Sequence, residues 1–191
     1  MHEEPVEELT PLLGRQLLHT ETMTIGRIIL AAGISAPVAT AAPTCDPPAR
    51  WEANRADLAS RVVALVNGFR SHRGLRRLAL SRALTASSRW KSLHMAAHGT
   101  FAHEDRAPPV ARSAYQRALD CRYRGRSWGE NIAFGYESPR SVVAGWLASP
   151  GHRANIANPR FTSTGVGVAA TGSGRLYWTQ AFGDDVRTAR K

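Results

Sequence analysis

The chain has 191 residues, which suits one domain of ordinary size and is short for two. With 43% hydrophobic and 21% charged residues, it is neither a disordered nor a collagen-like sequence. It carries 25 Lys and Arg residues against 15 Asp and Glu, and no run of about 20 apolar residues that would span a membrane. The positive charge predicts attraction to anionic surfaces. Because nearly all the bases are arginine, which codon bias alone can produce, we expect no specific recognition of nucleic acid.

Residues 1–22 are acidic and precede a segment that is typical of a secretory signal. Residues 23–42 contain a basic start at Arg27, a short apolar run and the small residues Ala39-Thr40-Ala41. We therefore predict a signal peptide over 23–42, no transmembrane span after its cleavage, and secretion to the extracellular side. Residues 1–22 are then a gene-model extension. The alternative is a genuine acidic tail on a cytosolic protein.

Two cysteines, Cys45 and Cys121, remain after the predicted cleavage. An even number of cysteines in an exported protein favours a disulfide, and two free thiols are the alternative. Cys45 lies in a proline-rich stretch, so we interpret residues 43–57 as a linker that leads into a domain over 58–185. Residues 186–191 form a basic tail.

Helical and strand-like patterns alternate along this domain. Gly99 is a natural end for a helix, and Ser138 followed by Pro139 is typical of a helix cap and first turn. Apolar residues at helical spacing predict the other helices, and two strand-like runs on either side of a Gly-Ser-Gly turn predict a hairpin. In chain order we predict helices over 58–69, 81–98 and 111–119, a strand over 132–136, a helix from 138, a helical turn from 149, and hairpin strands over 165–169 and 176–182.

Three short clusters hold the side chains that could do chemistry. They surround His103, Glu130 and His152, and we expect each at a helix end or in a loop, where functional groups are displayed. Two imidazoles and a carboxylate that met in the fold could bind a divalent metal such as zinc or transfer protons. The two histidines are far apart in the sequence, so their spacing alone does not show that they meet.

Taken together, these clusters resemble the CAP (SCP/PR-1-like) domain superfamily in its short bacterial form. The resemblance covers about residues 58–183, and several motifs in a fixed order make it specific. They are Phe101-x-His103, Gly129-Glu-Asn-Ile-Ala133, Trp146-x-x-Ser-Pro-Gly-His-Arg-x-Asn-Ile156, Gly165-Val-Gly167 and Tyr177-Trp-Thr-Gln-x-Phe182.

The resemblance implies an α+β fold, a three-layer α-β-α sandwich with a small antiparallel sheet and a central cleft. In the family, two histidines and two acidic residues line that cleft. By motif, the histidines are His103 and His152 and the first acid is Glu130, so these three residues are the implied metal ligands. The position of the second acid is Ser149 here, which weakens any mechanism that needs two carboxylates.

The resemblance implies a secreted, non-enzymatic module that binds a lipid or cell-envelope ligand in a cleft able to hold a divalent cation. The alternative is a metal-dependent or histidine-based hydrolase acting on peptide or envelope substrates. No Gly-x-Ser-x-Gly nucleophile motif is present to support it. A third hypothesis, a protein that binds polyanions, rests on charge alone.

The remaining polar and aromatic residues have structural interpretations. We expect Asn131 and Asn155 to hydrogen-bond loop backbone. We predict that Phe101, Trp146, Trp178 and Phe182 are core residues, and that His72, His94, His98, Arg122, Arg124 and Arg126 are solvated.

Overall fold

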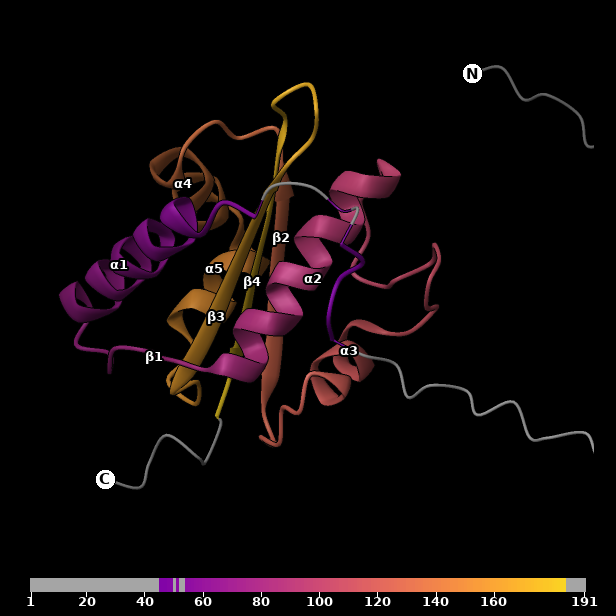
Figure 1. Ribbon diagram of the computed structural model, residues 1–191. Coiled ribbons are helices and arrows are strands. Elements are labelled where there is room, and N and C mark those ends of the chain that lie inside the picture. The colour runs from indigo at the N-terminus through magenta and orange to yellow at the C-terminus, as the bar shows by residue number, and fades with distance from the viewer. Residues whose placement is uncertain (1–44, 50, 52–53, 185–191) are drawn as a thin grey trace, which may run out of the picture. The chain divides into compact units, whose positions relative to one another are not determined.

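The computed structural model describes residues 45–49, 51 and 54–184 (Figure 1). The predicted N-terminal extension, signal peptide and basic tail lie outside these residues. None of the described helices is both long and apolar enough to cross a membrane. In chain order the elements are α1 (Ala56–His72), β1 (Ala79–Leu80), α2 (Arg82–His98), α3 (Ala114–Asp120), β2 (Trp128–Phe134), α4 (Pro139–Ala148), α5 (Pro150–Ala157), β3 (Ser163–Ala170) and β4 (Leu176–Gly183).

The four strands form one sheet in the order β1-β3-β4-β2. The hairpin strands β3 and β4 pair antiparallel, and β2 pairs antiparallel with β4, which leaves β2 at an edge. The short strand β1 pairs parallel with β3, so the sheet is mixed at that edge rather than wholly antiparallel. Sequence patterns missed β1 because two residues carry no periodicity.

Helices cover both faces of the sheet, which confirms the α-β-α sandwich (Figure 1). On one face, Val62 and Val66 of α1 join Trp146 of α4 and Ile156 of α5 in a cluster with Trp178 of the sheet. On the other face, α2 and α3 pack against the sheet, with Leu84, Ala118 and Ala181 in one cluster. The motif residues therefore lie in the sheet, in α4 and α5 on one of its faces, and in the loop that follows α2 on the other.

The helix ends follow the predicted signals. Ser81 accepts the Leu84 N–H at the start of α2, and Gly99 ends that helix with φ +61°, a conformation that favours glycine. Ser138 and Ser141 form a capping box at the start of α4, with Pro139 in the first turn. These contacts confirm the predicted helix boundaries at Gly99 and Ser138.

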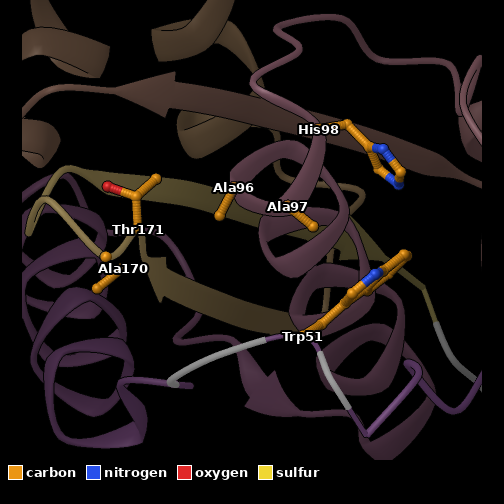
Figure 2. A pocket seen from close by; sticks show the side chains of 7 residues that line it. Trp51, Ala96, Ala97, His98, Ala170 and Thr171 are labelled. Atoms are coloured by element: carbon orange, nitrogen blue, oxygen red, sulfur yellow. The ribbon is translucent and has the colours of Figure 1, made fainter.

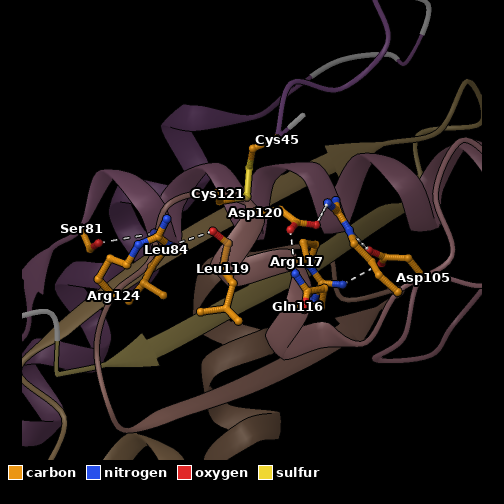
Figure 3. Close-up of a disulfide and its surroundings, with 11 residues drawn as sticks. Cys45, Ser81, Leu84, Asp105, Gln116, Arg117, Leu119, Asp120, Cys121 and Arg124 are labelled. Atoms are coloured by element: carbon orange, nitrogen blue, oxygen red, sulfur yellow. Dashed lines mark hydrogen bonds and ion pairs between the residues drawn. A yellow bond between two sulfur atoms is a disulfide. The ribbon is translucent and has the colours of Figure 1, made fainter. Parts of the chain in front are cut away.

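Cys45 and Cys121 form the predicted disulfide (Figure 3). It ties the segment that precedes α1 to the residue that caps the C-terminal end of α3. The bond closes a long loop in the unfolded chain, and such a cross-link stabilises the folded state.

Two predictions about burial were wrong. Phe101 is 51% exposed rather than part of the core, because it follows the end of α2 and packs on the surface against Phe134. His94 is fully buried rather than solvated, because its ring stacks on Trp90 and meets the edge of Trp51. The other burial predictions are confirmed: Trp146, Trp178 and Phe182 are buried, and His72, His98 and the three arginines Arg122, Arg124 and Arg126 are exposed.

Candidate functional site

Glu130 lies inside strand β2, not in a loop as its cluster predicted. The strand begins four residues before the predicted start at Ile132, because the Gly129–Ala133 run pairs continuously with β4. The Glu130 side chain is fully buried, and its Oε1 lies 2.9 Å from Nδ1 of His103. His103 sits in the loop that follows α2, with 46% of its side chain exposed. The structure therefore brings the first two predicted site residues into direct contact.

Arg117 of α3 occupies the other side of the same carboxylate. Its guanidinium Nη2 donates to Glu130 Oε2, and both side chains are fully buried. Both oxygens of Glu130 are thus engaged, one by His103 and one by Arg117. Sequence reasoning missed Arg117, because one arginine on a short helix in an arginine-rich chain carries no distinguishing signal.

His152 approaches from the opposite helical layer, on the first turn of α5. Its backbone carbonyl accepts a hydrogen bond of 3.1 Å from Asn131, and Asn155 donates to Asn131 Oδ1 at 2.9 Å. Asn155 also lies within 3.3 Å of the Glu130 carbonyl, so both asparagines bind backbone as predicted. Burial lowers the pKa of His152, and electrostatic repulsion from the nearby imidazole of His103 lowers it further. The two imidazoles are therefore close enough for one to affect the protonation of the other.

Ser149, which stands where the family has its second acid, ends α4 and begins α5. It lines the same cavity as His152. Glu104 could have replaced the missing carboxylate in space, but it forms an exposed ion pair with Arg106 at 3.2 Å. Glu137 is also exposed. Glu130 remains the buried carboxylate of this site.

An apolar cavity of about 230 Å³ opens between the edge strand β2 and helices α4 and α5. Its rim carries exposed aromatic side chains, and the rings of Phe101 and Phe134 lie 4.9 Å apart. His152, Ser149 and the Tyr136 hydroxyl supply polar groups to its lining. The lining residues are Phe101, Ile132, Ala133, Phe134, Tyr136, Gly145, Trp146, Ser149 and His152.

The sequence predicts a metal site with three ligands. Glu130 does not fit as the third ligand, because its carboxylate is fully buried and its two oxygens face Arg117 and His103 Nδ1. Across residues 45–49, 51 and 54–184, no group of three His, Cys, Asp or Glu side chains is arranged to hold a metal ion. The outward-facing Nε2 of His103 and the ring of His152 are the groups left for a cation, with Glu130 as the outer partner that orients His103.

Two further cavities lie away from the motif residues. One, about 410 Å³, is lined by Trp51, Ala96, Ala97, His98, Ala170, Thr171 and Gly172 (Figure 2). It holds none of the predicted site residues. The other, about 230 Å³, lies between α1 and α2 beside Val63, Leu80 and Val166. Size alone therefore does not identify the functional cavity, and the converging polar groups do.

The described cysteines form a disulfide, so that part of the chain offers no free thiol as a nucleophile. The site nevertheless contains an imidazole whose Nδ1 is bound to a buried carboxylate. That arrangement fixes a histidine ring for accepting a proton or binding a ligand. The site can therefore form hydrogen bonds, bind a cation or transfer a proton beside an apolar cavity.

Known proteins are similar to this chain in sequence and in fold. The family described as "Cysteine-rich secretory protein family", abbreviated CAP, matches residues 63–182. The protein YkwD of Bacillus subtilis is 38% identical over 122 residues, which covers 64% of this chain and 45% of that protein. The membrane protein YlbC of the same organism is 29% identical over 133 residues, covering 70% of this chain and 36% of that one. This chain thus spans less than half the length of these curated relatives.

Solved structures agree. An extracellular SCP-domain protein from Bacillus anthracis superposes with a TM-score of 0.59 and 26% identity, covering 67% of this chain and 40% of that chain. An outer surface protein of Borrelia burgdorferi superposes with a TM-score of 0.60 and 18% identity, covering 68% and 93% of the two chains, and this second likeness concerns the fold. Because the family match extends over more than half of the chain and includes every predicted site residue, the chain belongs to the CAP family of cysteine-rich secretory proteins.

Proposed function

We propose that the chain is an exported, non-enzymatic binding module whose ligand is an amphiphile of lipid or cell-envelope type. The observation that carries the proposal is the cavity beside β2, where exposed aromatic side chains and His152 line one space. An apolar body fits among Phe101, Phe134 and Tyr136, and a polar group fits at the histidine end. Export is supported by the predicted signal peptide and by relatives described as extracellular or outer surface proteins.

The polar end of the ligand would meet His103 and His152. These two imidazoles are also the groups that would hold a divalent cation such as zinc, with the ligand or water completing its coordination. Because Glu130 is committed to Arg117 and His103, its part is to orient His103. The basic surface of the chain would favour approach to anionic envelope polymers, in a salt-dependent way.

The proposal is tested with cis-parinaric acid, a fatty acid whose fluorescence rises in an apolar site. We expect saturable binding by the oxidised protein, and a loss of about tenfold or more in affinity for Phe134→Asp, which places a charge in the cavity rim. Tyr115→Asp is the matched control, because Tyr115 is 40% exposed, close to the 43% of Phe134, and lies on α3 away from the cavity. Equal binding by the two variants would contradict the proposal.

A hydrolase is the second candidate, and the contact between His103 and Glu130 is the observation that favours it. A carboxylate on Nδ1 leaves Nε2 free to accept a proton from water or a substrate hydroxyl. Release of product from peptide or envelope substrates, lost in His103→Ala and retained in His72→Ala, would support catalysis. Lack of turnover together with binding of cis-parinaric acid would support the binding module.

A further inference from the structure

A chain of buried charges runs from the cleft into the layer formed by α2 and α3. Asp105 is fully buried and binds Lys91 Nζ at 3.1 Å and Arg112 Nε at 2.9 Å. Arg112 also binds Asp120 at 2.7 Å, which extends the chain of charges to the end of α3. The three cations Lys91, Arg112 and Arg117 balance the three carboxylates Asp105, Asp120 and Glu130.

Arg117 is where this network reaches the cleft. Its Nη1 donates to Asp105 Oδ1 at 2.6 Å and to the backbone carbonyl of His103 at 3.1 Å. Its Nη2 donates to Glu130 Oε2. One guanidinium thus holds both the backbone of His103 and the carboxylate that binds the ring of His103. Asp105 in turn holds Arg117 in place.

The donors and acceptors of these groups determine where the hydrogen of the His103 ring lies. A guanidinium has donors and no acceptor, so whichever atom of residue 130 faces Arg117 must be an acceptor. With the carboxylate in its charged form, the remaining oxygen is also an acceptor and faces His103 Nδ1 at 2.9 Å. The hydrogen of the neutral imidazole then resides on Nδ1, and Nε2 carries the lone pair on the exposed edge of the ring.

We propose that Arg117 is a positioning residue that holds the Glu130 carboxylate against Nδ1 of His103, so that Nε2 faces the cleft with a free lone pair. The inference rests on the proposed function in placing the ligand at His103. It adds the chemical class of the group that His103 meets. That group is a hydrogen-bond donor, such as a hydroxyl, an ammonium or the protonated carboxyl of a fatty acid, or a cation, and not a carbonyl or other pure acceptor.

The test reads the tautomer of His103 directly from the ¹⁵N chemical shifts of its ring, without any ligand. Spectra of the oxidised, ¹⁵N-labelled chain are recorded at about pH 8, where imidazole in water is neutral. His103→Gln identifies the signals of this ring among those of the seven histidines. We expect the hydrogen on Nδ1 in the wild type, and a hydrogen on Nε2 with a bare Nδ1 would overturn the proposal.

Glu130→Gln separates the role of Arg117 from that of a simple packing residue. Because Arg117 only donates, the new side-chain amide must turn its oxygen toward Arg117 and its NH₂ toward His103. The NH₂ requires an acceptor at Nδ1, so we expect the ring hydrogen to move to Nε2. In Glu130→Gln with Arg117→Met the amide is free to turn, and we expect a mixture of the two tautomers.

Arg112→Met is the matched control, because Arg112 belongs to the same network and bonds neither Glu130 nor His103. We expect it to keep the wild-type tautomer even where it lowers stability. Two results would overturn the proposal. One is a Glu130→Gln spectrum in which the ring hydrogen stays on Nδ1. The other is a spectrum of Glu130→Gln that does not change when Arg117→Met is added. If the double variant does not fold, the ring tautomers of the wild type and of Glu130→Gln still test the proposal. If the ring hydrogens lie where we expect them and the protein does not bind cis-parinaric acid, the result counts against the proposed function alone.

Discussion

Arg117 and Cys121 lie one helical turn apart on α3, with the Cys121 N–H donating to the Arg117 carbonyl at 3.0 Å. The disulfide to Cys45 therefore closes the same turn of helix that carries the guanidinium behind the cleft (Figure 3). A helix of seven residues is too short to be stable alone. Its position depends on this disulfide at one end and on the buried charges along its length.

Removing the disulfide is expected to cost stability. The bond joins residues 76 positions apart, and loop-closure entropy for a loop of that size corresponds to a stabilisation of about 4 kcal/mol. Cys45→Ser with Cys121→Ser should lower the urea midpoint accordingly, and reductant should lower that of the wild type to match. A wild-type midpoint insensitive to reductant would show that the bond contributes nothing.

Gly167→Ala is expected to disrupt the packing of α2 on the sheet. A Cβ at Gly167 would lie 2.3 Å from the Ser88 and Arg89 backbone, which cannot move as a side chain could. We predict a loss of about 3 kcal/mol or more in the free energy of unfolding. Gly68→Ala is the contrast, because Gly68 lies within α1 with open space around it, and alanine there should stabilise by about 0.5–1 kcal/mol. Equal effects of the two changes in urea denaturation would contradict this account.

Arg70 ties the end of α1 to the segment after α5. Its buried guanidinium donates to the carbonyls of Arg76, Ile156, Asn158 and Phe161 at 2.8 to 3.1 Å, and burial lowers its pKa. Arg70→Met leaves these acceptors without their donor, so we expect a cost of about 3 kcal/mol, measured by urea denaturation. Arg61→Met removes an exposed arginine of the same helix and should change stability by less than about 0.5 kcal/mol.

His94 is expected to make the fold sensitive to acid. Burial lowers its pKa, and the weaker contact of Nε2 with the Ala107 carbonyl at 3.0 Å opposes that shift. Because the folded pKa lies below the unfolded value of about 6.5, the unfolded chain binds the proton first as the pH falls. The contribution to stability is complete above about pH 6.5 and is lost below it, with a slope of at most about 1.4 kcal/mol per pH unit.

His94→Gln should retain the contact with Ala107 and lose this acid sensitivity. Urea denaturation at pH 7.5 and pH 5.5 should show a smaller difference for the variant than for the wild type. His72→Gln, at an exposed position, should leave the difference unchanged. A pH dependence equal in the wild type and His94→Gln would contradict the argument.

Local patterns predicted most of the fold. The helix cap at Ser138 and the Gly99 stop are chemical signals within a few residues, and the structure follows them. Strand β1 has two residues and forms because its edge pairs with β3 far along the chain. No local pattern can reveal a strand that depends on such a distant partner.

The sequence predicts which residues form the site, but not the hydrogen bonds and ion pairs that connect them. The motifs identify His103, Glu130 and His152, and the structure places the first two in contact. Arg117 escaped detection because its role comes from α3 packing behind β2, a tertiary contact that no spacing encodes. His94 was misplaced because histidine is usually exposed, although Trp90 one turn earlier on α2 marked that helix face as buried.

The most direct test of the binding cleft is to locate a bound amphiphile. Isotope-filtered NOEs between unlabelled decanoate and ¹³C-labelled protein report which side chains lie beside the alkyl chain. The cleft account predicts NOEs from decanoate methylenes to the rings of Phe101, Phe134 and Tyr136 around the β2 cavity. NOEs confined to Val63 and Leu80 in the cavity between α1 and α2, or to Trp51 in the cavity beside His98, would contradict it.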